Sequence, residues 1–288
     1  MQNKKILITG SSGMLGSEFI SSMQESYSIC SLPSGIDISE TLKVIKTLSD
    51  IKPNIIIHAA AYTDVDGCEQ NPKKAHRVNV LGTENIANYC SINNVKLVYI
   101  SSTGVYGDKK NVNYSENDKP SPQTIHHSSK LEAESLVTNL VSDYLILRVG
   151  WLYGGGINQK NNFVYKRFLE AKNTSVIYSS SSQIGNPTSC KDVVRQAFLL
   201  INKNQKGIFN CVNKACGVTR FHYVKEIIEQ FGLDCRVELA SSDMFQRLAP
   251  VSPNESAVNE RLGLIGLDIM PFWKDALSQY IDELKLEL

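Results

Sequence analysis

The sequence predicts an α/β fold with a doubly wound parallel sheet and a smaller C-terminal α+β lobe. Short apolar runs typical of buried strands alternate with amphipathic helical patterns through the first 150 residues. The first run, residues 6–8, leads into three evenly spaced glycines, and beyond Gly150 the alternation weakens. We therefore expect a Rossmann-type domain over residues 1–150, joined by segments returning from about 190–215, and a mainly substrate-binding lobe over residues 151–288.

The glycine turn is the first element that points to chemistry. Gly10, Gly13 and Gly16 follow the first strand, and Leu15 and Phe19 lie at helical spacing after it. Glycine allows a tight turn and a close backbone approach to a diphosphate, which the free N–H groups and dipole of a helix attract. A purely structural turn is the alternative. The cofactor interpretation assigns dinucleotide contacts to Gly10, Ser12, Gly13, Met14, Leu15 and Gly16.

The second strand, residues 28–32, bears on which dinucleotide binds. An acidic residue at its end would bind the ribose 2′-hydroxyl of NAD, whereas a basic one would favour the 2′-phosphate of NADP. Residues 31–34 contain neither, so we expect NADP(H) or NAD(H), with a slight preference for NADP(H) because no carboxylate repels the phosphate. Asp37, followed by Ile38, either accepts a hydrogen bond from the adenine amino group or caps a helix over residues 40–49.

The third and fourth strands, residues 55–57 and 96–100, both end in residues suited to a site. The third leads into His58 and into Ala59, Ala60 and Ala61, whose small side chains let a cofactor lie close. We expect His58 itself to be a hydrogen-bonded interior residue. A polar loop over residues 62–69 and a helix over residues 72–92 come next. The fourth strand leads into hydroxyl-rich residues 101–107, at the edge where α/β sheets place their chemistry.

The remaining elements follow from the same patterns. Residues 111–124 are polar and contain two prolines, which indicates a loop, and a helix then begins near His126. A fifth strand is expected over residues 144–148 and a later strand over 208–212. Further helices are expected over residues 193–200, 221–231 and 272–286, and a short turn over 179–182.

Composition narrows the class of partner. With 30 Lys and Arg against 29 Asp and Glu, the net charge of +1 gives no reason to expect nucleic acid or an anionic membrane. No apolar run approaches the roughly 20 residues of a membrane span, and residues 1–5 do not resemble a signal peptide. The seven cysteines are scattered without metal-ligand spacing. We therefore expect a cytoplasmic protein with reduced thiols and no metal site.

Together these segments resemble the extended short-chain dehydrogenases/reductases and, more narrowly, the dTDP-4-dehydrorhamnose reductase family. The resemblance runs along most of the chain. Residues 53–69 (PNIIIHAAAYTDVDGCE) and 183–188 (QIGNPT) are its more specific parts, and the glycine turn is less specific. The other matching stretches are residues 9–16, 78–79, 82–83, 101–107, 128–130 with Glu134, 148–154 (RVGWLYG) and 162–163.

The resemblance implies a catalytic set with one departure. In the family a tyrosine protonates the sugar C4 carbonyl oxygen as hydride leaves the nicotinamide, a hydroxyl residue hydrogen-bonds that oxygen, and a lysine holds the ribose. By position the hydroxyl is Ser102, the lysine is Lys130, and the tyrosine is replaced by His126. The proton could then come from His126 through a water, from Ser102, or from a tyrosine such as Tyr106. His127 is expected on the solvent side.

The resemblance also implies cofactor contacts for Asn79 and Lys130, and a substrate pocket with a second departure. The family has an arginine in a late R-P-x-x-S-x-L segment, whereas residues 252–258 here read SPNESAV, so the nucleotide sugar stays open. Trp151 either stacks on the substrate or is a core aromatic, and Thr63 and Val65 either line the pocket or cap and pack a helix. The implied substrate contacts are Thr63, Val65, Ser102, Thr103, Trp151, Asn162, Phe163, Gln183 and Pro187.

The predicted activity is NAD(P)H-dependent reduction of a nucleoside-diphosphate-linked 4-keto-6-deoxy sugar in surface polysaccharide synthesis, with a homodimer as the assembly to test. Two alternatives stay open. One is an epimerase or dehydratase of the same superfamily, which would retain its cofactor. The other is a cofactor-binding regulatory or partner subunit, a role that occurs in this family and that His126 and the lost arginine favour.

Overall fold

The computed structural model describes residues 4–23, 27–33, 35–241, 244 and 247–288. Two expectations fall partly outside the described residues: the one on a signal peptide, which involves residues 1–3, and the one on the end of the second strand, which involves Ser34. Within the described residues a six-stranded sheet has the order β10-β5-β4-β3-β1-β2, with every pair parallel. The doubly wound parallel sheet is thus confirmed. Its strands are β1 (Lys5–Thr9), β2 (Ser28–Ser31), β3 (Ile55–His58), β4 (Lys96–Ser102), β5 (Tyr144–Val149) and β10 (Gly207–Cys211).

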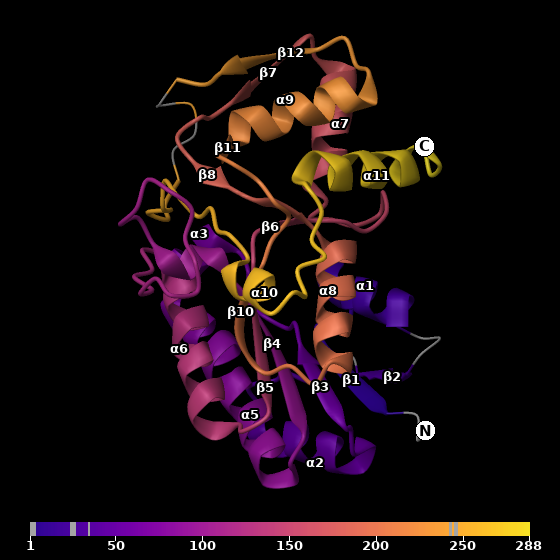
Figure 1. Ribbon diagram of the computed structural model, residues 1–288, viewed down its shortest axis with the longest axis vertical. Coiled ribbons are helices and arrows are strands. Elements are labelled where there is room, and N and C mark those ends of the chain that lie inside the picture. Colours follow the sequence, from indigo (N-terminus) through magenta and orange to yellow (C-terminus); the bar gives the residue numbers. More distant parts are fainter. Residues whose placement is uncertain (1–3, 24–26, 34, 242–243, 245–246) are drawn as a thin grey trace.

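Helices cover both faces of the sheet because successive strand residues point to opposite sides (Figure 1). In β1, Ile6 and Ile8 join a buried cluster with Phe19, whereas Leu7 joins a separate cluster with Val44 on the other face. The first face is covered by α1 (Met14–Met23) and α8 (Cys190–Asn202). The second face is covered by α2 (Thr41–Ile51), α5 (Gly82–Asn93) and α6 (Ile125–Leu140).

Two connections differ from the expected ones. The stretch 62–69, expected as a loop, forms most of the short helix α3 (Val65–Gln70), whose N-cap Asp64 accepts a hydrogen bond from the N–H of Gly67. The helix expected over residues 72–92 is divided into α4 (Pro72–His76), a π-helical turn (Arg77–Leu81) and α5. The π-helical turn buries Asn79 and turns it toward the carboxyl end of the sheet, where Tyr62 lies.

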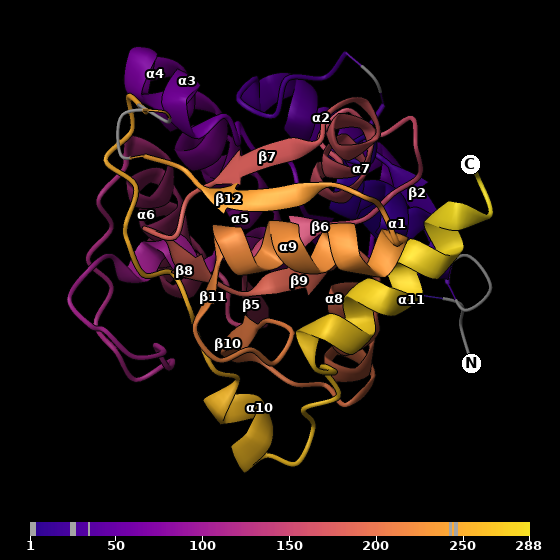
Figure 2. The same cartoon turned by 90° about the horizontal axis from the view of Figure 1, so that it is seen from above.

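The C-terminal lobe lies at the end of the sheet where β5 continues into β6 (Trp151–Tyr153). Figure 2 shows its helices and its pair of strands, β7 and β12, from above. Buried aromatic residues such as Tyr153 and Tyr223 form its core. Its other elements are α7 (Phe163–Asn173), β7 (Val176–Ser179), β8 (Ile184–Gly185), β9 (Pro187–Ser189), β11 (Val218–Thr219), α9 (Arg220–Phe231), β12 (Arg236–Leu239) and α11 (Trp273–Lys285). The short helix α10 (Glu260–Leu264) packs instead against β10 of the large sheet, with Leu262 in the same buried cluster as Ile6.

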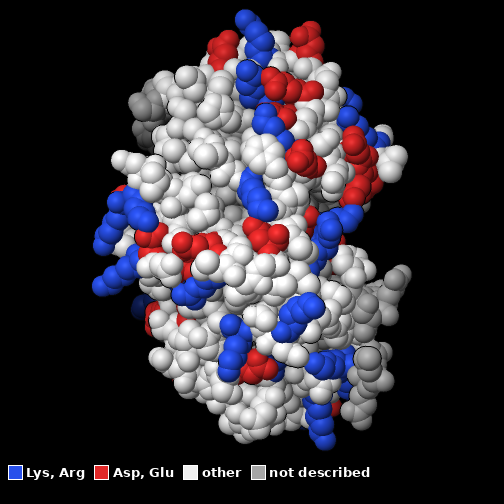
Figure 3. All heavy atoms as spheres, in the orientation of Figure 1, with Lys and Arg blue, Asp and Glu red and all other residues white. Residues whose placement is uncertain are grey.

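We propose that the domain boundary near residue 150 is the right division of the chain. Two observations support it: β10 pairs with β5 in the large sheet, and α8 covers the same face of that sheet as α1. Basic and acidic side chains are interspersed over the face shown in Figure 3. Among the described residues, none of the helices has both the length and the apolar composition that crossing a membrane requires.

Candidate functional site

The glycine turn after β1 has a conformation that requires glycine at two positions. Gly10 adopts a φ of +68°, and a Cβ there would lie 2.7 Å from the backbone of Ala60. A Cβ on Gly16 would lie 2.1 Å from the carbonyl oxygen of Gly10. A side chain at Gly10 would therefore push the turn away from the end of β3, and a side chain at Gly16 would push α1 away from the turn.

This turn sits where the strand order reverses, between β1 and β3, which is where open α/β sheets bind ligands. Ser12 and Gly13 are exposed at the start of α1. The backbone N–H groups of Ser12, Met14 and Leu15 donate to no protein acceptor in the described part of the chain. Free amides at a helix N-terminus suit a diphosphate, so these residues fit an NAD(P) dinucleotide.

The expected adenosine end of the cofactor site contains Asp37, which does not cap α2. The N-cap of α2 is Glu40, so that alternative was wrong. The carboxylate of Asp37 accepts hydrogen bonds from the N–H and hydroxyl of Ser39, which lower its pKa, and it lies 3.4 Å from the guanidinium of Arg77. Ile38 is buried against Gly82 of α5, so its side chain supports this edge from inside.

Ser102 and Lys130 lie at the carboxyl end of β4 and on α6. Ser102 is half-buried, and its hydroxyl accepts a hydrogen bond from the N–H of Gly104. Lys130 is buried, with its Nζ 4.6 Å from the ring centroid of Tyr99, and no described carboxylate lies within 4.0 Å of it. Burial lowers the pKa of Lys130 to about 8, partly opposed by Glu134. The ammonium is thus held in a site that offers no protein anion in contact with it.

His126 is buried one turn before Lys130 and is engaged with the backbone. Its Nδ1 lies 3.1 Å from the carbonyl oxygen of Tyr62, an acceptor only, so Nδ1 carries a proton that it donates there. Burial, His127 and Lys130 lower the pKa of His126 to about 3. The imidazole is therefore neutral at physiological pH, and a neutral imidazole is a poor replacement for a protonating tyrosine.

Asn79 fixes the position of this carbonyl group. Its side chain accepts from the N–H of Tyr62 and donates both to the carbonyl of Tyr62 and to the hydroxyl of Ser129. Only 1% of Asn79 is exposed, so it has little surface for the cofactor. We propose that Asn79 acts by holding Tyr62 and α6 in place.

Tyr106, suggested above as a proton source, is a structural residue. It is fully buried, its hydroxyl donates to Asn210 over 2.7 Å, and its ring stacks on Tyr114 at 4.9 Å. The guanidinium carbon of Arg148 lies 4.9 Å from the ring centroid of Tyr106. Burial raises the pKa of Tyr106 to about 12 despite Arg148. The hydroxyl is thus neither accessible nor acidic enough to protonate a substrate.

Trp151 stands at the entry to the lobe with both its ring and its N–H engaged. The indole Nε1 donates to Glu255 over 2.9 Å. The guanidinium carbon of Arg220 lies 3.5 Å from the ring centroid of Trp151 and 5.6 Å from that of Phe163. Burial lowers the pKa of Arg220 to about 10, although Glu255 opposes this. Two expected substrate residues, Trp151 and Phe163, are therefore brought together around an arginine.

The other expected substrate residues fall into two groups. Thr63 is exposed, and it does not cap α3, because Asp64 does. Val65 begins α3 and is half-buried, as is Gln183. Asn162 is fully buried; it caps α7 and donates to Tyr280 and to two carbonyls, which favours a structural role. Thr103 and Pro187 are buried beside Ser102 and Trp151, respectively.

Three residues of this region were not found from the sequence: His127, Glu255 and Arg220. The expectation that His127 faces solvent was wrong, because only 6% of it is exposed. A signal was present, since residue 127 lies three positions before Lys130 and three-residue spacing also places side chains on one helix face. Glu255 and Arg220 lie in segments far from Trp151 in the sequence, so no residue spacing could predict that they contact it.

Comparisons with known proteins agree with this architecture. The family model of the RmlD substrate-binding domain matches residues 4–286. The chain is 28% identical over 282 residues to the spore coat polysaccharide biosynthesis protein SpsK of Bacillus subtilis, covering 97% of each chain. It matches the structure of a dTDP-4-dehydrorhamnose reductase of Clostridium acetobutylicum with a TM-score of 0.93 and 32% identity, covering 98% of this chain and 99% of that one. It also matches the structure of the dTDP-4-dehydrorhamnose reductase of Bacillus anthracis in complex with NADP, with a TM-score of 0.93 and 30% identity, covering 98% of this chain and 100% of that one.

These matches extend over nearly the whole chain, in sequence and in structure. They include the glycine turn, the end of β4, the start of α6 and the C-terminal lobe. The chain therefore belongs to the family of the RmlD substrate-binding domain, that of the dTDP-4-dehydrorhamnose reductases, and so to the NAD(P)-dependent oxidoreductases with the extended short-chain dehydrogenase/reductase fold.

Proposed function

We propose that this protein reduces the keto group of a nucleoside-diphosphate-linked 4-keto-6-deoxy sugar. The observation that carries the proposal is Lys130, a buried ammonium with no described carboxylate within 4.0 Å, on the helix that runs beside Ser102. A cation held in this way is suited to the hydroxyls of a ribose and to the oxygen of a polarised carbonyl. Ser102 supplies a hydroxyl that can hydrogen-bond that carbonyl oxygen.

The residues that would hold the cofactor follow from the geometry of the turn. When bound, NAD(P)H supplies the hydride for reduction of the ketone. The free amides of Ser12, Met14 and Leu15 would bind its diphosphate, and Ala59, Ala60 and Ala61 would leave room for it across the sheet. We propose a preference for NADP(H), supported by the guanidinium of Arg77 near Asp37 and by the absence of an acid at Ser31 and Pro33.

The substrate class is supported by the lobe. Trp151 offers an aromatic ring, and Arg220 brings a guanidinium beside it from α9, a different segment from the one that carries the family's arginine. An arginine beside an aromatic ring suits a phosphorylated nucleoside or sugar. The B. subtilis relative is named for polysaccharide biosynthesis, which agrees with a product used in a surface glycan.

The test is an activity assay on the purified full chain. We expect oxidation of NADPH, and more slowly of NADH, when dTDP-4-dehydro-6-deoxy sugar is added. A Lys130→Met variant should lose at least 10²-fold in kcat/KM while a Lys225→Met variant, changed on the exposed surface of α9, should not. Binding of NADPH with no turnover of any keto-sugar nucleotide would instead favour the regulatory-subunit alternative, and tightly co-purified NAD would favour an epimerase.

Location and assembly extend the proposal. Because both a dinucleotide and a nucleoside-diphosphate sugar are needed, we propose that the protein works in the cytoplasm. The homodimer stays a prediction that light scattering of the purified protein can check.

A further inference from the structure

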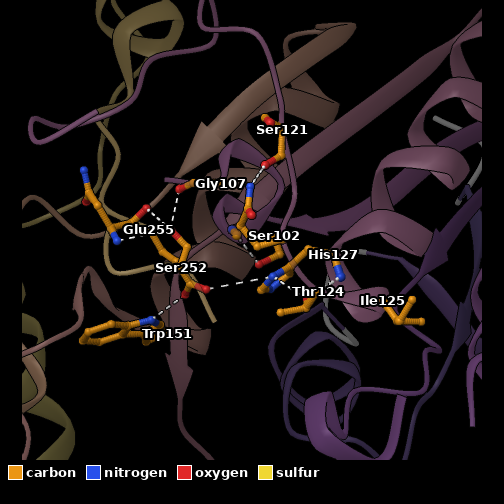
Figure 4. A network of polar contacts seen from close by, with 12 residues as sticks. Ser102, Gly107, Ser121, Thr124, Ile125, His127, Trp151, Ser252 and Glu255 are labelled. Carbon is orange, nitrogen blue, oxygen red and sulfur yellow. Dashed lines mark hydrogen bonds and ion pairs between the residues drawn. The ribbon is translucent and has the colours of Figure 1, made fainter. Parts of the chain in front are cut away.

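His127 occupies the space next to Gly104, in the turn that follows β4. A Cβ on Gly104 would lie 2.2 Å from both Cε1 and Nε2 of the His127 ring. Gly104 in turn donates its N–H to the hydroxyl of Ser102. Figure 4 shows Ser102 beside the His127 ring. The Cε1–Nε2 edge of the imidazole therefore packs against Gly104, the residue whose N–H is bonded to the hydroxyl that is expected to contact the substrate carbonyl.

The opposite edge of the same ring faces a carboxylate. Nδ1 of His127 lies 3.1 Å from the hydroxyl of Thr124 and 4.0 Å from a carboxylate oxygen of Glu255. The Glu255 side chain is only 13% exposed, and its second oxygen accepts from Trp151, so its position is fixed. Figure 4 shows Glu255 between His127 and Trp151. A carboxylate behind an imidazole stabilises the imidazolium and orients the ring.

His126 lacks these features. Its Nδ1 is committed to the carbonyl of Tyr62, and the described residues include no carboxylate within 4.0 Å of its ring. The two rings are 5.1 Å apart, so both lie near the same part of the site, but only His127 is paired with an anion.

We propose that His127, rather than His126, delivers the proton to the carbonyl oxygen of the substrate, with Glu255 as its positioning residue. The inference rests on the proposed reductase activity. When the carbonyl carbon accepts a hydride, the π-electron pair of the C=O bond moves to oxygen, which takes one proton from Nε2 of His127. The ketone is reduced, NAD(P)H is the reductant that is oxidised, and the neutral imidazole regains a proton from water.

The groups that face His127 set the pH dependence. They are Glu255 from the C-terminal segment, and Lys130 and His126 from α6; Ser102, Gly104 and Thr124 add no charge. Burial and Lys130 lower the pKa of His127 below its ordinary value, and Glu255 acts in the opposite direction. Because the protonated ring is the active form, kcat should be highest in mildly acidic buffer and fall as pH rises through this pKa.

The experiment compares the wild type with His127→Asn, His126→Asn and Glu255→Gln. We expect His127→Asn to lose about 10² to 10³ in kcat with little change in KM, and His126→Asn to lose less than about tenfold. Imidazole in the buffer should restore activity to His127→Gly, which a purely structural role would not allow. His222→Asn is the matched control. His222 lies three residues after Thr219, the N-cap of α9, as His127 lies three residues after Thr124, but His222 is exposed at the surface.

Glu255→Gln should move the decline of kcat to lower pH, since removal of the anion disfavours the imidazolium. The same shift should appear in the pKa of His127 measured by NMR, a readout that needs no cofactor or turnover. An active wild type whose His127→Asn variant keeps its kcat would overturn this inference alone. A wild type inactive on every keto-sugar nucleotide would overturn the proposed function and, with it, this role of His127. Unchanged His127 pKa in Glu255→Gln would overturn the pairing.

Discussion

At the scale of single residues, two buried histidines, His58 and His126, make the stability of the protein depend on pH. His58 is buried, with Nδ1 2.7 Å from the hydroxyl of Thr9 and Nε2 3.1 Å from that of Thr83, as expected for an interior histidine. Burial and the charge of Lys130 lower its pKa to about 3, and His126 is lowered to a similar value. Both rings are neutral in the folded state, whereas in the unfolded chain they take up protons near pH 6.5.

The stability of the wild type should therefore fall with decreasing pH from about 6.5 toward 3, because the unfolded state binds more protons in that window. Each buried imidazole adds at most about 1.4 kcal/mol per pH unit. We expect His58→Gln to be less stable at neutral pH but to lose stability less steeply between pH 6.5 and 4.5. Urea unfolding at several pH values measures this slope. His222→Asn controls for loss of an exposed imidazole, and equal slopes for His58→Gln and wild type would contradict the prediction.

The sequence pointed to Ser102 and Lys130 only through the resemblance to the family, by their positions in residues 101–107 and 128–130, and their catalytic roles stay predictions. It could not decide how His126 is used, since that depends on Tyr62, 64 positions away, whose carbonyl takes its Nδ1 proton. The three-residue spacing between His127 and Lys130 does place both on one face of the helix, but the space that the His127 ring fills beside Gly104 is visible only in the structure. The sequence gives the type of each side chain directly, but the groups that surround His126 and His127 come from segments distant in the sequence.

At the scale of elements, the start of α6 links helix stability to the site. Thr124 is the N-cap of α6: its hydroxyl accepts from the N–H of His127 and also lies 3.1 Å from the His127 ring. Thr124→Ala should cost about 1 kcal/mol of stability through the lost cap. It should also lower kcat, because the His127 ring loses one of the two groups that hold Nδ1.

The matched control for this change is Thr219→Ala. Thr219 caps α9 in the same way, accepting from the N–H of His222 with the ring nitrogen of His222 at 3.1 Å. Thermal or urea unfolding should show a similar loss of stability in both variants, whereas only Thr124→Ala should lose activity. Thr124→Ser should behave as wild type in both respects. Equal kcat values for the two alanine variants would contradict the link between cap and site.

Elements with a strong periodic signal were predictable, and those without one were not. Strands β1, β3, β4 and β5 are apolar runs, α8, α9 and α11 were expected within a few residues of their observed bounds, and the start of α6 was expected within one residue. The two-residue strands β8 and β11 are too short to show alternation and exist because they pair with each other. The π-helical turn at Arg77–Leu81 was missed because its residues fit a continuous helix equally well.

At the scale of the whole molecule, the C-terminal segment 252–259 joins the lobe, the loop over residues 107–124 and the large sheet. Tyr114 exchanges backbone hydrogen bonds with residues 256 and 258, and the N–H of Ile184 donates to the carbonyl of residue 253. Asn254 lies at the centre of this segment and is 4% exposed. It donates to the carbonyls of Lys110 and Val112 and accepts from both the N–H and the hydroxyl of Ser256. The residue that follows it is Glu255.

This arrangement makes Asn254 a test of how distant segments build the site. Asn254→Ala would leave the carbonyls of Lys110 and Val112 and the buried polar groups of Ser256 without their partner. Each buried group left unsatisfied costs about 1–3 kcal/mol, whereas the carbonyl of the exposed Val112 can bond to water instead. We expect lower stability in urea and, at temperatures where the variant is still folded, a reduced kcat, because Glu255 would no longer be held behind His127. Asn173→Ala is the matched control, since the exposed Asn173 amide bonds only to Leu169 within its own helix. If Asn254→Ala unfolded more readily but kept the wild-type kcat and pH profile, the segment would stabilise the fold without positioning Glu255.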